Sequence, residues 1–245
     1  MTGLLYKELV QNKKLLLILL LFVYPLLWGV AVGFILTSDR EPHIAFFTTC
    51  LSEMAMFYLL ETIKINLLRV DESHRWTDWV IASPKAESGY VYAKYLLIFS
   101  MNIAAVVLCI WTDLAITSFL TGEYGIGAAV PMLLCCGNLF LAALELPLMF
   151  RFSARLGEQI HACLFLGVVF LAMVYALFGD LSMFGTTEGF LEWVFAQWKQ
   201  IQDGNVPGWM TLLLGLFPCG SLGLYAGSYF LSCKLYRKGA MYHET

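Results

Sequence analysis

Residues 15–36 read LLLILLLFVYPLLWGVAVGFIL, an apolar run with no charged side chain. An α-helix rises about 1.5 Å per residue, so about 20 such residues cross the roughly 30 Å hydrocarbon core of a bilayer. Five further long apolar runs follow, and we expect a single transmembrane domain over residues 1–245, all-α and polytopic. The six expected spans are residues 15–36, 44–68, 91–120, 126–150, 160–178 and 209–233.

The composition agrees with this prediction. Hydrophobic residues make up 60% of the 245 and charged residues only 13%, whereas a soluble domain carries roughly a quarter charged residues. The formal net charge of −3 provides no basic surface that could neutralise phosphates, so a nucleic-acid partner is not expected. The first run is too long for the core of a signal peptide, and we read it as a retained first span.

The positions of the basic residues predict the topology, because cytoplasmic loops carry an excess of Lys and Arg. With the N-terminus inside, twelve of the 15 basic residues fall on the cytoplasmic side, which also places the C-terminus inside. Arg40 and Lys199 fall outside, and Lys64 lies near the inner end of the second span. The twelve are Lys7, Lys13, Lys14, Arg69, Arg75, Lys85, Lys94, Arg151, Arg155, Lys234, Arg237 and Lys238.

Motifs for enzymatic chemistry are missing from the sequence. It has no Gly-x-x-x-x-Gly-Lys-[Ser/Thr] loop for ATP, no His-Glu-x-x-His and no Gly-x-Ser-x-Gly. The seven cysteines include no Cys-x-x-Cys pair, and the four histidines are scattered. We therefore expect no catalytic residue, no metal site and no cofactor in this chain.

The stretch after the second span predicts a short cytoplasmic helix. Trp76, Trp79 and Val80 are spaced i, i+3 and i+4, which gives the helix one apolar face, and Pro84 ends it. Such a helix could lie among the lipid headgroups or dock onto a soluble partner. Its mixed acidic and basic residues favour docking, because helices that bind membrane surfaces are usually rich in Lys and Arg.

Two other stretches outside the spans have an amphipathic pattern. Residues 2–14 predict an N-terminal helix along the inner leaflet, in which Lys7, Gln11 and Lys14 share one face. Residues 188–201 predict an extracellular helix between the fifth and sixth spans, which would rest in the outer interface or cap an exit path.

Ionisable residues inside spans are costly and are often functional. Glu53 lies near the middle of the second span and Asp113 in the outer part of the third, so both are candidates for a substrate or ion path. The alternative is that they only form hydrogen bonds between helices. Glu61 and Lys64 are spaced i, i+3 and are expected to pair, and Glu145 lies in the fourth span.

Aromatic and small residues suggest further roles. Phe46 and Phe57 of the second span could form an adaptable apolar wall of a substrate path, although contact with lipid explains them equally well. Small residues allow helices to approach closely. The predicted helix-contact positions, within the chain or in a dimer, are Gly29, Gly33, Gly223 and Gly227.

Two motifs resemble the membrane subunits of bacterial type-2 ATP-binding-cassette (ABC) exporters, in particular small stand-alone permeases. The first is the start Leu4-Leu5-Tyr6-Lys7-Glu8-Leu9. The second is Asp71-Glu72-Ser73-x-x-Trp76 followed by Ser83-Pro84 and then Val91-Tyr92-Ala93-Lys94-Tyr95. The resemblance is in topology over the whole chain and in motif over about residues 4–14 and 71–95.

The resemblance implies a mechanism and partners. The N-terminal helix would be an elbow helix, and residues 71–83 would be a coupling helix seated in a separate ATPase chain that holds ATP and Mg. A second permease, identical or homologous, would complete the unit in the bacterial plasma membrane. The implied coupling residues are Asp71, Glu72, Arg75, Trp76, Asp78, Trp79 and Pro84.

The cargo of such permeases is typically an amphipathic peptide, such as an antimicrobial peptide, and the aromatic spans suit such a cargo or another hydrophobic molecule. Two rival hypotheses remain open. One is an ion- or proton-coupled transporter that uses Glu53 and Asp113, and the other is a membrane immunity protein that binds a peptide without transporting it.

Overall fold

A computed structural model describes residues 2–37, 42–73, 86–118, 128–152 and 208–240, with short helical pieces between 155 and 174. These described residues are helical almost throughout and include no strand. The prediction of an all-α chain is therefore confirmed for them. Most of the expected fifth span and all of the expected extracellular helix 188–201 lie outside the described residues.

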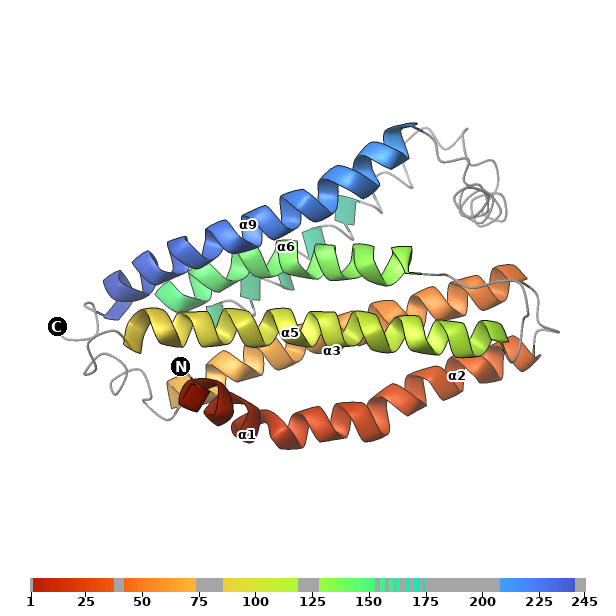
Figure 1. The fold of residues 1–245 in the computed structure, drawn as a ribbon, viewed down its shortest axis with the longest axis horizontal. Helices are drawn as coiled ribbons and strands as arrows, with labels where there is room; N and C mark the ends of the chain where they lie inside the picture. Colours follow the sequence, from red (N-terminus) through yellow and green to blue (C-terminus); the bar gives the residue numbers. More distant parts are fainter. Residues whose placement is uncertain are drawn as a thin grey trace.

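The N-terminal helix is continuous with the first expected span. α1 (Thr2–Ile18) passes through the π-helical segment η1 (Leu19–Val23) into α2 (Tyr24–Thr37), and the ribbon bends between α1 and α2 (Figure 1). Pro25 explains the π-turn, because it has no N–H and its ring would meet the carbonyl four residues back. The Tyr24 N–H instead bonds the Leu19 carbonyl. The amphipathic helix expected over residues 2–14 and the first expected span are therefore parts of one continuous helical backbone, which changes direction at η1.

Four long helices complete the described bundle: α3 (Pro42–Ser73), α5 (Ala86–Ile116), α6 (Ala129–Arg151) and α9 (Gly208–Ala240). α1, α2 and α5 run one way along the long axis, and α3, α6 and α9 run the other way (Figure 1). The start of α1, the end of α3 and the start of α5 therefore gather at one end of the molecule, together with the ends of α6 and α9. Most of the basic residues described lie toward this end, which we call the basic end.

The core lies where α3, α5, α6 and α9 meet. Its buried residues include Phe57, Leu139 and Leu146, and Tyr225 of α9 donates a hydrogen bond to the Tyr95 carbonyl. The outer surface is apolar as well: Phe22 and Phe230 are about 70% exposed. Exposed apolar surface on this scale is expected of a protein surrounded by lipid rather than by water.

Three described helices are long and apolar enough to cross a membrane: Gly3–Thr37, Ser88–Ile116 and Ala129–Arg151. α3 contains the whole expected second span, 44–68, but also carries Glu53, Glu61 and Lys64. The count of six spans and the inside location of both termini stay predictions.

Candidate functional site

A cluster of buried charges lies at the basic end, where α1, α3 and α5 meet. Lys94 of α5 is fully buried and its ammonium lies 2.6 Å from Glu8 Oε2 of α1 and 2.6 Å from Asp71 Oδ2 of α3. It donates a third hydrogen bond, of 2.9 Å, to the Leu67 carbonyl. An ammonium has three N–H donors, so these three acceptors account for all of them.

Two neighbours complete this group, which we call the Lys94 cluster (Lys7, Glu8, Asp71, Tyr90 and Lys94). Lys7 Nζ lies 2.6 Å from Asp71 Oδ1 and 3.3 Å from Glu8 Oε1, and the Tyr90 hydroxyl donates to Asp71 Oδ2 at 2.8 Å. Two ammonium groups thus face two carboxylates. Buried charges are tolerated when they are paired and hydrogen-bonded in this way.

α1 turns two polar side chains, Glu8 and Asn12, toward the bundle, while Lys13 and Lys14 are exposed. Glu8 and Asn12, spaced i, i+4, are 1% and 2% exposed, whereas Tyr6 and Leu9 are 71% and 47% exposed. Asn12 donates to the Glu8 carbonyl, and Gln11 reaches Asp71 at 3.4 Å. This orientation suits a helix whose polar residues Glu8 and Asn12 face its protein neighbours.

Asp71 lies inside the chain rather than on a surface that could meet a partner. It is 2% exposed. Burial alone would raise the pKa of its carboxyl, but the ammonium groups of Lys94 and Lys7 outweigh that effect and hold the pKa below its ordinary value. Any contribution of Asp71 to coupling would therefore be indirect, through Lys94 and Lys7.

The lowered pKa of Asp71 predicts a pH dependence of stability. A carboxyl whose pKa is lowered by folding stabilises the protein above its unfolded pKa of about 3.9, and that contribution is lost as the pH falls through the folded pKa. Asp71→Asn should cost roughly 2 kcal/mol or more near neutral pH, and the cost should shrink below about pH 4. Thermal unfolding of both proteins from pH 7 to 3 tests this, and a cost independent of pH would contradict it.

A second buried cluster joins α3 to α6. Lys64 pairs with Glu61 one turn away, as its spacing predicts, and lies 2.5 Å from Glu145 Oε2 of α6. Lys64 and Glu145 are 3% and 0% exposed. The pairing of Glu61 with Lys64 is confirmed, and the partner across the helices is Glu145.

Glu53 and Asp113 lie in the interior between α3 and α5. Glu53 is fully buried, and neither of its carboxylate oxygens has a hydrogen-bond partner among the described residues. Asp113 is 3% exposed and close enough to act electrostatically on Glu53. The two carboxyls that the sequence nominated separately are therefore near enough to influence each other electrostatically.

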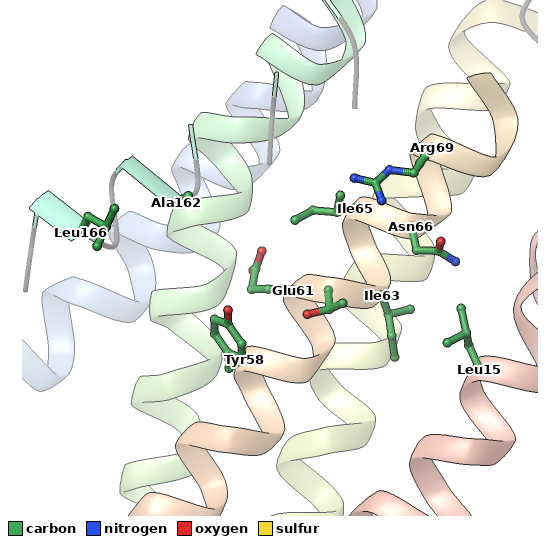
Figure 2. A pocket seen from close by; sticks show the side chains of 10 residues that line it. Leu15, Tyr58, Glu61, Ile63, Ile65, Asn66, Arg69, Ala162 and Leu166 are labelled. Atoms are coloured by element: carbon green, nitrogen blue, oxygen red, sulfur yellow. The ribbon is translucent and has the colours of Figure 1, made fainter. Parts of the chain in front are cut away.

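A pocket of about 550 Å³ lies beside the half of α3 nearer the basic end, and its volume is typical of small-molecule sites. Figure 2 shows Tyr58, Glu61, Asn66 and Arg69 of α3 around it. Its apolar wall comes from three elements and consists of Leu15, Ile63, Ile65, Ala162 and Leu166.

The predicted path residues do not line this pocket. Phe57 is part of the core, Phe46 is buried near the start of α3, and Glu53 and Asp113 are buried between α3 and α5. The helix turns from Tyr58 to Arg69 line the pocket instead.

Most predicted coupling residues lie outside the described part of the chain, namely Arg75, Trp76, Asp78, Trp79 and Pro84. Glu72 is in the last turn of α3, and its side chain is not described. Their role in coupling stays a prediction.

The predicted helix-contact glycines face away from the described bundle. A Cβ added at any of the four would meet no described atom within 4 Å. α2 packs through Trp28, Ala31 and Ile35 instead, and α9 through a face that includes Ser228 and Ser232, both hydrogen-bonded to the Tyr95 hydroxyl. Contact at Gly29, Gly33, Gly223 and Gly227 stays a prediction, for a second chain or for residues outside the described part of this one.

A described bundle of long apolar helices with an apolar outer surface is the architecture of a multi-pass membrane protein. The family model described as "ABC-2 family transporter protein" matches residues 3–237. The chain therefore belongs to the ABC-2 transporter family, as the resemblance indicated, and is a membrane permease of an ABC transporter. Neither the curated proteins nor the solved structures contain a match to this chain.

Glu8 was not nominated as a site residue from the sequence. The signal was present, because Lys7-Glu8, Asp71 and Lys94 all belong to the motifs that carry the resemblance. Charges of both signs near three expected helix ends on one side of the membrane could have suggested a cluster, but spacing along the chain cannot show which charges meet.

Proposed function

We propose that this permease exports amphipathic peptides or similar hydrophobic molecules, driven by a separate ATPase chain. The observation that supports this most directly is the pocket beside α3. Its wall combines Leu15, Ile63 and Ile65 with the polar groups of Thr62 and Asn66. A surface of both characters suits a cargo with an apolar and a polar side.

The position of the pocket also suits a cargo drawn from the inner leaflet. Tyr58 and Arg69 are eleven residues apart on one helix, so the lining runs about 16 Å along α3. Arg69 lies toward the basic end, just beyond the expected span, and Ile63 and Ile65 lie deeper, between Arg69 and Glu61. A cargo could enter with its polar group near Arg69 and its apolar part along the helix.

The motor in this proposal is a partner ATPase that holds ATP and Mg and docks onto the expected coupling helix, residues 71–83, most of which lies in segment 74–85. The sequence supports this division of labour, because the chain has no phosphate-binding loop and the segment has an apolar Trp face. A second permease subunit and the bacterial plasma membrane complete the proposed unit.

Transport in reconstituted vesicles tests the proposed function. The permease and its ATPase would be placed in liposomes with ATP on the ATPase side, and a fluorescent amphipathic helical peptide would be followed. We expect ATP-dependent movement of the peptide that stops with an ATPase unable to hydrolyse ATP. Movement that continues with the inactive ATPase would contradict the proposal.

Filling the pocket should block transport. Thr62 is exposed and lines the pocket, so Thr62→Trp adds bulk there without entering the core. We expect peptide export to fall roughly tenfold or more, equivalent to about 1.4 kcal/mol, while the ATPase stays bound. Met54→Trp is the matched control, because Met54 is 56% exposed on the same helix but does not line the pocket. Equal export by both variants would contradict a cargo site here.

One observation favours a second function. Glu53 is a buried carboxyl without a described hydrogen-bond partner, next to Asp113, and such a pair could bind a proton that drives transport. Glu53→Gln keeps the shape and removes the titration. If a proton gradient without ATP drives peptide movement in wild type and not in Glu53→Gln, the proton-coupled reading gains over the ATP-driven one.

A further inference from the structure

The Lys94 cluster connects parts of the chain that are distant in sequence. The bond from Lys7 to Asp71 spans 64 positions and the bond from Lys94 to Glu8 spans 86. Each of the two carboxylates receives both ammonium groups, so neither Glu8 nor Asp71 can move far without breaking contacts with α5 as well. The N-terminal helix is thereby tied to α3 and α5 at the basic end.

The same cluster joins the two stretches of chain that flank segment 74–85. α3 ends at Ser73, and α5 begins at Ala86. Asp71 on the first flank accepts one hydrogen bond, of 2.8 Å, from Tyr90 on the second flank and lies 2.6 Å from Lys94 on the same flank as Tyr90. The end of α3 and the start of α5, which flank the segment on which docking is proposed, are therefore held together. Glu8 connects α1 to the same cluster.

The directional hydrogen bonds of this cluster fix the position of α1 along α3 and α5, which apolar packing alone would not do. Replacing a buried charge network with apolar residues of similar volume is often neutral or stabilising, so stability alone does not account for this arrangement. Three saturated donors on Lys94 demand acceptors at three positions from two helices. An apolar contact at the same place would allow α1 to slide or rotate against α3 and α5.

We propose that Lys94 is a positioning residue that makes α1 and both flanks of segment 74–85 move as one body, so that an ATPase docked on this segment acts on α1 as well. The inference rests on the proposed function for its use of an ATPase. The tie itself is a property of the permease alone and is measurable without a partner.

The first test is hydrogen exchange of the purified permease without ATPase. Glu8→Gln/Asp71→Asn/Lys94→Met removes the three fully buried charges of the cluster together, and the remaining ammonium of Lys7 is 23% exposed and so can be solvated. We expect amide exchange in α1 to become at least tenfold faster. The matched control is Glu61→Gln/Lys64→Met/Glu145→Gln, which makes the same changes at the α3–α6 cluster and should not alter exchange in α1. Unchanged exchange in α1 of the first variant would overturn the inference.

The second test measures coupling with the ATPase present. A merely structural role would reduce folding or assembly, whereas a positioning role lowers the amount of peptide exported per ATP hydrolysed by complexes that still form. We expect this ratio to fall at least fivefold in the neutralised variant and to recover partly in Lys94→Arg, which keeps the cation. An unchanged ratio would overturn the coupling role.

The two tests separate this inference from the proposed function. A wild-type complex that exports no peptide would overturn the proposed function and the coupling role together, and the exchange measurement would still decide whether Lys94 ties α1 to α3 and α5. A wild-type complex that exports peptide, with faster exchange in the variant but an intact ratio, would refute only the coupling role.

Discussion

Lys94→Met alone should destabilise the permease by about 3–5 kcal/mol, the usual cost of removing one partner from a buried ion pair. Glu8 and Asp71 are 1% and 2% exposed, so water cannot solvate their carboxylates when the ammonium is lost. Lys7, which is partly exposed, contacts both carboxylates but would be left to neutralise two charges. Thermal unfolding in detergent, followed by circular dichroism, should show a midpoint lower by on the order of 10 °C.

The compensated variant separates charge from volume in this result. Glu8→Gln/Asp71→Asn/Lys94→Met removes the unpaired charges that make the single change costly, and we expect most of the lost stability to return. If the single and the triple variants unfold at the same temperature, the cost arises from packing around Lys94 and not from its ion pairs. Wild-type stability of the single variant would show that the buried pairs contribute little.

Trp76→Ala/Trp79→Ala should abolish capture of the ATPase. The two side chains form the apolar face of the expected coupling helix, and large aromatic anchors carry most of the binding energy in protein interfaces, at 2 kcal/mol or more each. A loss of about 4 kcal/mol weakens binding roughly a thousandfold. Co-purification of permease and ATPase in mild detergent should therefore pass from stoichiometric capture to none.

The control for this prediction must show that the permease is intact. Unfolding temperature and elution volume of the double variant should match the wild type, because the two residues lie in a connection between helices and outside the described core. Trp111→Ala is a matched variant, since Trp111 is 66% exposed on the lipid-facing side of α5 and should not affect capture. Undiminished capture by the Trp76/Trp79 variant would place ATPase docking elsewhere.

The helices themselves were readable because their signal is local. A run such as 91–120 is apolar for long enough to cross a bilayer, and inside a bilayer its backbone must satisfy its own hydrogen bonds. α5 accordingly spans Ala86–Ile116 and α3 spans Pro42–Ser73. The pairing of Glu61 with Lys64 was equally local, since it depends only on i, i+3 spacing within one helix.

The continuity of α1 with α2 was harder to predict from the sequence. The amphipathic pattern of residues 2–14 and the apolar run 15–36 differ in composition, which suggested two elements with a turn between them. A change of composition does not require a break in the backbone, and the helix continues through Ile18 and deforms only at η1, before Pro25. The local signal for the deformation was Pro25 itself.

What residue order determines in this chain is its set of helices, its apolar exterior and, through its motifs, its family, because each depends on neighbours a few residues apart. What only the packing of the helices decides is which charges meet. Lys94 could have faced lipid headgroups, a partner or the interior, and it lies between Glu8 and Asp71 because α1, α3 and α5 converge at one end of the bundle. The spacing of the glycines likewise allows a close approach of helices, but it does not determine which face packs. In the described bundle, α2 and α9 turn other faces inward.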